Sequence, residues 1–285
     1  MNNKSHPKLS WLRSDPECRL GLKGARFTRT SSLLTSFIAL VLTILFYVGI
    51  RFLPSTFKPI EDIFCDRGLI QYFSVFATSW GVAILIVKGL KLKLQRKCLD
   101  YFIVPQESDF VLSTTTVEDV FENIYSIVDD PKHFVLFNRI AVALSNLRNL
   151  GRVTDVDEIL RSQAEHDESI MESSYSLIRG LIWAVPVLGF IGTVLGLSEA
   201  ISGFGGVMAA TEDMSEITSA LKGVTAGLAT AFDTTLVALI AALCLQMATT
   251  FLHKHEEEFL DNCSEYCQRH IVNRLRIMPF HSDEA

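Results

Sequence analysis

Hydrophobic residues gather in four long blocks, over residues 33–53, 72–90, 177–204 and 221–252. Each block is close to or longer than the ~20 residues that a helix needs to cross a bilayer. The first and fourth blocks lack the polar stripe that a buried helix of a soluble protein usually keeps. The pattern predicts an all-α, polytopic membrane protein with four transmembrane helices, the first two joined by a short outer loop within residues 33–90.

The polar segment between the second and third blocks, residues 91–176, has the periodicity of helices. Pro131 is placed to start a helix that Gly151 would end, and a further helix can start near Thr154. Nothing between Thr154 and Pro186 would stop that further helix, so we expect it to run into the third block. An earlier helix is indicated by apolar residues at helical spacing, namely Val117, Val120, Phe121, Ile124 and Val128.

The two ends of the chain carry different patterns. Residues 1–32 are polar and basic without a clear period, which predicts a flexible arm. Residues 253–285 follow the fourth block without Gly or Pro until Pro279, which predicts a helical extension and a tail. The last two transmembrane helices, within residues 177–252, are therefore expected to extend into the cytoplasm.

Lysine and arginine side chains indicate the orientation, because they are enriched in cytoplasmic loops. Basic residues precede the first block and follow the second and the fourth, whereas the connections 54–71 and 205–220 are acidic on balance. The charges predict that both termini and residues 91–176 are cytoplasmic. The first block begins well inside the chain and lacks a small-x-small cleavage site, so we expect it to be retained as a transmembrane helix.

Small residues recur every four positions in the last two blocks. Gly192, Gly196 and Ala200 do so in the third block, and Gly223, Gly227, Ala231 and Thr235 do so in the fourth. Such residues lie along one helix face and let backbones approach closely. Packing within one subunit and packing between subunits around a shared axis both account for the pattern. The residues predicted to pack helices are Pro186, Gly189, Gly192, Gly196, Gly223, Gly227 and Ala231.

Five polar residues lie deep in these two blocks: Thr193, Thr230, Asp233, Thr234 and Thr235. A threonine can bond to its own helix at little cost, whereas an Asp at the centre of a transmembrane helix costs ~2.5–3.5 kcal/mol on insertion scales. Asp233 is therefore the best candidate for a functional ionisable group. At 100° per residue it lies near Thr230 and away from the face of Thr235, so the helix has two polar faces.

Enzymatic and metal-binding signals are weak. The chain has no nucleophile elbow, P-loop, zinc-protease or dinucleotide motif. Cys263, Cys267 and His270 share one helical face, but three residues on a solvated helix fall short of a typical four-ligand site. Only Cys65 lies on the predicted outer side, so the six cysteines do not form a disulfide framework. We expect no enzyme activity, cofactor, metal or nucleic-acid partner.

The segment AVPVLGFIGTVLGL, followed after an acidic loop by GVTAGLATAFDTTLVALIAAL, resembles the MotA/TolQ/ExbB proton-channel superfamily. The resemblance covers residues 177–252, and the four blocks with cytoplasmic termini are similar to the topology of MotA. It implies a homopentamer in the bacterial cytoplasmic (inner) membrane, around two single-span MotB/TolR/ExbD-like partners that each carry a membrane Asp. By the same resemblance, Thr193 and Thr235 match the threonines of the two pore helices, and Thr230 replaces a pore glutamate of TolQ and ExbB.

The resemblance implies the pore-forming subunit of a proton-driven or sodium-driven motor or energiser complex. Asp233, one turn after Thr230, is our hypothesis for the missing pore carboxylate. Relatives serve outer-membrane transport, motility, export and defence, and no segment matches the torque-generating helix of the flagellar stator. The alternative is a non-conducting oligomeric scaffold in the lipid bilayer. A substrate transporter is less favoured, because the chain shows no inverted repeat or broken helix pair.

Overall fold

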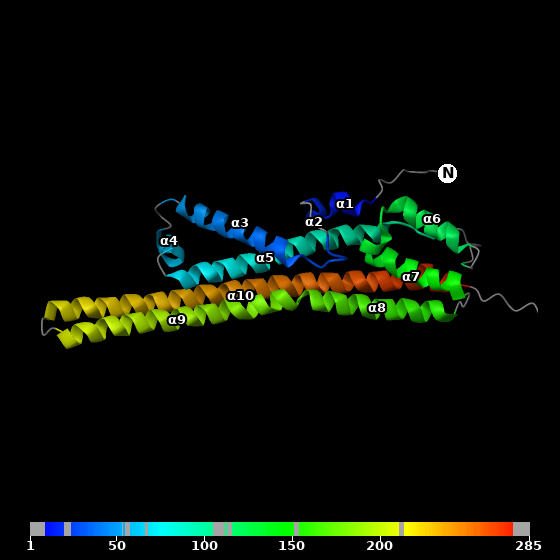
Figure 1. The fold of residues 1–285 in the computed structure, drawn as a ribbon. Helices are drawn as coiled ribbons and strands as arrows, with labels where there is room; N and C mark the ends of the chain where they lie inside the picture. Colours follow the sequence, from blue (N-terminus) through cyan, green and yellow to red (C-terminus); the bar gives the residue numbers. More distant parts are fainter. Residues whose placement is uncertain are drawn as a thin grey trace, which may run out of the picture. The chain divides into compact units, whose positions relative to one another are not determined.

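The computed structural model describes residues 9–19, 24–52, 54, 58–65, 68–104, 112, 116–150, 154–210 and 214–275 (Figure 1). These residues are helical with short connections, and within them β pairing is limited to two isolated bridges, Leu9 with Val128 and Leu112 with Leu275. Four helical stretches are long and apolar enough to cross a membrane, within Ser32–Arg51, Leu69–Asp100, Asp155–Gly206 and Ile217–Arg274. The predicted all-α membrane fold is confirmed.

The chain divides into two compact units, which follow the alternation of polar and apolar segments. Unit 1 contains Met1–Ser31, Val87–Ser174 and Leu252–Ala285, and unit 2 contains Ser32–Ile86 and Tyr175–Phe251. The hydrophobic blocks thus form unit 2, whereas most of the polar segments form unit 1. Two helices, α5 (Leu69–Arg96) and α10 (Met214–His270), contribute residues to both units.

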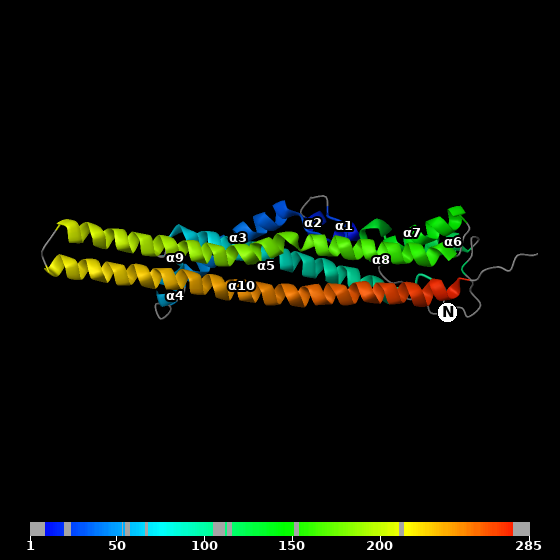
Figure 2. The same cartoon turned by 90° about the horizontal axis from the view of Figure 1, so that it is seen from below.

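Unit 2 is built from α3 (Ser32–Arg51), α4 (Lys58–Cys65), α9 (Ser176–Ala210) and parts of α5 and α10. Its helices α9 and α10 lie side by side in both views (Figures 1 and 2). The indole Nε1 of Trp80 on α5 donates to Thr35 Oγ1 on α3 at 3.1 Å. Large apolar side chains remain exposed along these helices, among them Trp183 and Phe232, as expected for surfaces that face lipid or another subunit.

The helix that was expected to run from Thr154 past Pro186 has a single interruption. Helix α8 spans Thr154–Ser174 and α9 begins at Ser176, so Tyr175 alone separates them. The hydroxyls of Ser173 and Ser174 donate to the carbonyls of Ile170 and Met171 at 2.9 and 2.6 Å. Such bonds compete with the helical backbone ladder and weaken this turn. Pro186 lies inside α9 and does not end it.

Unit 1 has an apolar core formed by α6 (Val117–Ile127), α7 (Val135–Leu150), α8 and the carboxyl-terminal part of α10. The predicted apolar spacing is visible in α6, where Val117, Val120 and Ile124 are fully buried. Pro131 starts a 3₁₀ turn, Pro131–His133, rather than α7 itself. The predicted extension of the fourth block continues to His270 and buries Phe259 in this core.

The amino-terminal residues 9–19 and 24–31, which the sequence analysis assigned to a flexible arm, are folded into unit 1. They contain two short helices, α1 (Trp11–Ser14) and α2 (Pro16–Arg19). Trp11 is 1% exposed and its ring stacks on His133 with centroids 5.2 Å apart. Helices of four residues are too short to show a hydrophobic period, so the pattern could not reveal them. Residues 1–8 and 20–23 of the predicted arm lie outside the described residues.

Asp129 also holds the amino-terminal segment. Its carboxylate accepts hydrogen bonds from Ser10 Oγ at 2.7 Å and from the Trp11 backbone N–H at 3.1 Å. Burial by itself would raise the pKa of Asp129, but these hydrogen bonds outweigh burial and lower the pKa. The ionised carboxylate therefore stabilises this attachment.

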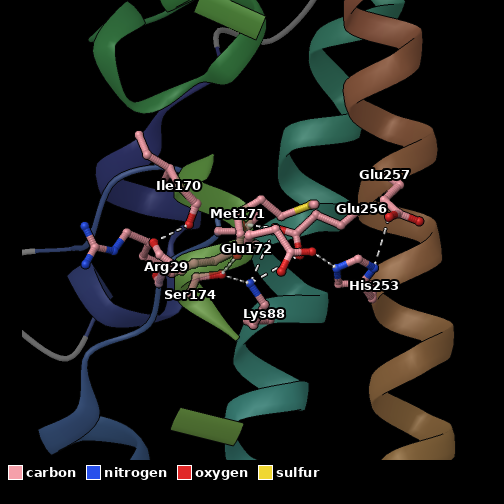
Figure 3. A network of polar contacts seen from close by, with 12 residues as sticks. Arg29, Lys88, Ile170, Met171, Glu172, Ser174, His253, Glu256 and Glu257 are labelled. Carbon is pink, nitrogen blue, oxygen red and sulfur yellow. Dashed lines mark hydrogen bonds and ion pairs between the residues drawn. The ribbon is translucent and has the colours of Figure 1, made fainter. Parts of the chain in front are cut away.

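Two buried lysines on α5 form ion pairs with carboxylates from distant parts of the chain. Lys91 Nζ lies 2.7 Å from Glu17 Oε2 and 3.5 Å from Asp15 Oδ1. Lys88 Nζ lies 3.2 Å from Glu256 Oε2 on α10 and donates to Ser174 Oγ at 2.7 Å (Figure 3). Glu256 also accepts a hydrogen bond from Thr28. These ion pairs and hydrogen bonds connect the amino-terminal segment, α5, α8 and α10 within unit 1.

We predict that Lys88→Met destabilises the protein by about 3–5 kcal/mol, because the substitution leaves the buried Glu256 carboxylate without its cationic partner. The measurement is the thermal unfolding of the detergent-solubilised chain. Arg96→Met is the matched control, since Arg96 pairs with Glu258 between the same two helices but the side chains are 43% and 48% exposed. The control should unfold close to the unsubstituted chain, and equal losses for both variants would contradict the prediction.

Candidate functional site

Two threonines, Thr193 on α9 and Thr235 on α10, join the helices at the centre of unit 2. Their hydroxyl oxygens are hydrogen-bonded to each other. Thr193 Oγ1 also lies 3.2 Å from the carbonyl oxygens of Gly189 and Ala231, and Thr235 Oγ1 donates to the Gly189 carbonyl at 3.0 Å. Both hydroxyls are thus used to hold α9 against α10, as polar side chains often are between transmembrane helices.

Glycines surround this hydroxyl pair and permit the close approach. A Cβ atom at Gly189 would lie 2.6 Å from the Ala238 Cβ, and one at Gly227 would lie 2.5 Å from the Ala200 Cβ. A Cβ at Gly192 would meet Thr234 Oγ1 at 3.0 Å, and one at Gly196 would lie 3.4 Å from the Gly227 carbonyl oxygen. Ala231 is fully buried. At these positions the small residues pack α9 against α10 within one chain.

Gly223 and Pro186 differ from the other predicted packing residues. A Cβ built at Gly223 would have no atom of the described residues within 4 Å, and Pro186 is half-buried. Gly223 instead lines a groove of about 410 Å³ between α9 and α10, which also contains Thr230 and Glu199. Glu199 is not among the site residues predicted from the sequence. Its position inside the third hydrophobic block was the signal that could have identified it.

The predicted polar residues divide between two faces of α10. Thr234 is buried with its hydroxyl on the Ala231 carbonyl, at 3.0 Å, and lies on the side that contacts α9. Thr230 donates to the Ala226 carbonyl at 3.0 Å, and both Thr230 and Asp233 are half-buried. The structure therefore brings Thr193, Thr234 and Thr235 to the contact between the two helices. Asp233 is not part of that cluster, as the helical spacing predicted.

Cys263, Cys267 and His270, which share one helical face, are packed against other side chains of unit 1. Cys263 and Cys267 are buried in the apolar core of unit 1. The ring of His270 packs on Tyr266, with centroids 4.6 Å apart. Among the described residues, no group of three His, Cys, Asp or Glu side chains is arranged to hold a metal ion.

The sequence that forms α9 and most of α10 matches a known protein family. Residues 135–265 match the model of the MotA/TolQ/ExbB proton channel family. The resemblance is confirmed over this segment. The match runs from the first residue of α7 into α10 and so includes the threonine pair and the glycines around it. No curated protein and no solved structure matches the chain. The four long apolar helices and the family match of residues 135–265 are those of a multi-pass membrane protein.

We predict that Gly227→Ala weakens the α9–α10 contact by about 1–3 kcal/mol, because the added methyl group overpacks the contact with Ala200. Gly223→Ala is the matched control, because it adds the same atom to the same helix in open space. The control should be neutral or slightly stabilising, since alanine favours helix more than glycine does. Thermal unfolding in detergent compares the two variants, and a stable Gly227→Ala protein would contradict the prediction.

Proposed function

We propose that this chain is the pore-forming subunit of a proton-driven or sodium-driven energiser complex. In this proposal the α9–α10 pairs of several copies, five by the family resemblance, surround a single-span partner that carries a membrane Asp. The observation that carries the proposal is the separation of two polar faces in unit 2. One face holds the Thr193–Thr235 pair inside the helix contact, and the other exposes part of Asp233.

The bonded threonines support the proposal by making α9 and α10 a single structural element. The hydroxyls and the close glycine packing hold the helix pair together within one chain. A pore wall that moves around a partner needs elements that keep their internal geometry while they slide. A tightly packed helix pair meets that requirement, because packed interiors do not deform continuously.

The position of Asp233 supports the proposal that protons or sodium ions pass along this helix pair. Phe232 and Leu236, its neighbours on α10, are 65% and 58% exposed, so this region of the helix is apolar and open to lipid or to another chain. A carboxylate in such a place is costly unless it faces a wet cavity or a partner. We infer that Asp233 faces the ion path and the single-span partner. Thr230, one turn before it on the same side, then completes a polar track.

The orientation is part of the same proposal. Unit 1 contains 21 of the 26 lysines and arginines of the chain, which favours a cytoplasmic location for it, with both termini inside the cell. The four apolar helices then lie in the bacterial cytoplasmic membrane. In this proposal the partner, and the structure that the complex contacts, determine the type of work that the ion flow drives.

We expect Asp233→Asn to reduce ion flux by at least about tenfold, because proton transfer by a positioned side chain commonly contributes more than that. The measurement is the quenching of a pH-sensitive dye in proteoliposomes that contain the chain with its co-purified single-span partner. Asp233→Glu, which keeps the carboxylate, should retain most of the flux. Asp261→Asn, an exposed change on the same helix, should retain all of it.

Two results would contradict the proposed function. Full flux through the Asp233→Asn complex would remove Asp233 from the ion path. An intact oligomer with its partner but without proton or sodium flux would identify the protein as a non-conducting scaffold. Counting the subunits of the same preparation tests the ring, since a monomer would exclude it.

A further inference from the structure

A hydrophobic pocket of about 510 Å³ lies within unit 2, where residues of α3, α4, α5 and α10 meet. Its walls include Leu42 and Phe46 of α3, Phe64 of α4 and Ala241 of α10. The longest wall is formed by α5, which contributes five residues within 74–82. The volume lies in the range of about 300–1,000 Å³ that is usual for ligand sites.

The chemistry of the lining suits a hydrocarbon. The described residues that line the pocket are all uncharged, and most of them are aliphatic or aromatic. Three residues of α5 carry hydroxyls, Ser74, Thr78 and Ser79, and the Thr78 hydroxyl donates to the Ser74 carbonyl at 2.8 Å. Apolar cavities stay dry. The pocket therefore favours an apolar ligand over an ion or a polar molecule.

The pocket is open at the surface of the membrane-spanning unit. Phe46, Val82 and Ile240 line it and are themselves exposed. The adjoining surfaces of α3 and α10 also expose large apolar side chains, such as Leu45 and Leu239. In a bilayer such surfaces face hydrocarbon rather than water. An acyl chain of the bilayer can thus enter the pocket without crossing water.

The length of the pocket and the residues at its end match one leaflet of a bilayer. Ser74 and Val82 are eight residues apart, which is ~12 Å along α5, and one leaflet contributes about half of the ~30 Å hydrocarbon core. Near the α4 end, Tyr47 stacks on Tyr72 with centroids 4.7 Å apart. Tyrosines are enriched at membrane–water interfaces. The exposed Arg51, which ends α3, adds a positive charge on this side.

The size of the pocket distinguishes an acyl chain from a helix of another subunit. A helix with its side chains is about 10 Å wide and would fill about 900 Å³ over this length, almost twice the volume of the pocket. A single acyl chain is narrower and bends to fit irregular walls. We propose that the pocket binds one acyl chain of a phospholipid, whose phosphate lies toward α4 and Arg51. The bound chain fills the space between α3 and α10.

The binding test uses the purified full chain, washed in detergent to remove bulk lipid and titrated with dioleoyl phosphatidylethanolamine. Native mass spectrometry counts the bound lipids, and we expect one tightly bound molecule per chain. Ala241→Phe should weaken this binding at least about tenfold, because the added ring overpacks the pocket. Ala248→Phe, the matched control, makes the same change at an exposed position of α10 outside the pocket. The absence of a tightly bound lipid, or equal binding by all three proteins, would overturn the proposal.

A second measurement on the unsubstituted chain decides the case in which Ala241→Phe does not fold. Phosphatidylethanolamine with a diazirine in the middle of one acyl chain is added at one molecule per chain, and peptide mass spectrometry locates the cross-links after illumination. We expect cross-links within residues 74–82 and 237–241, in preference to Leu243, an exposed apolar residue of α10 outside the pocket. Even labelling would overturn the proposal. If Ala241→Phe keeps its lipid but changes the number of subunits, a helix of a second copy occupies the pocket and the proposal is wrong.

Discussion

The close approach of α9 and α10 is the constraint on which the rest of unit 2 depends. At Gly189 and Gly227 even a methyl group would overlap the neighbouring helix. The same proximity lets the hydroxyls of Thr193 and Thr235 bond to each other and reach the Gly189 carbonyl. Since these hydroxyls are used within the chain, the proposed ion path depends on Asp233 and Thr230, which lie on the other polar face of α10.

Unit 1 differs from unit 2 in that it buries several charged side chains. Lys88 and Lys91 lie on one helix and are almost completely buried. Each has a carboxylate within ion-pair distance, Glu256 for Lys88 and Glu17 for Lys91. Arg139 and Asp167 form a third buried pair at 3.0 Å between α7 and α8. Such pairs add little net stability over an apolar core, but the loss of one partner is costly because it leaves a buried charge unpaired.

The sequence predicts most of the helices and part of the site. The four blocks and the spacing of Val117, Val120 and Ile124 depend on periodicity, which a single chain displays directly. The sequence shows Lys88 and Lys91 only as basic residues at the end of the second block, because their partners are distant in sequence and burial depends on tertiary contacts. For the same reason the spacing of Thr193 and Thr235 placed each on a helix but could not show that they bond to each other. Glu199 was missed although a charged residue inside a hydrophobic block is visible in the sequence; only its place in the groove depends on the packing of α9 against α10.

The hydrogen bond between Thr28 and Glu256 has a consequence for biosynthesis. The two residues are 228 positions apart, so a ribosome adds Glu256 long after Thr28. The attachment of residues 9–31 therefore cannot be completed until this part of α10 has been translated. A nascent chain that stops before Glu256 therefore leaves the Thr28 hydroxyl and the buried Lys88 ammonium without their carboxylate partner.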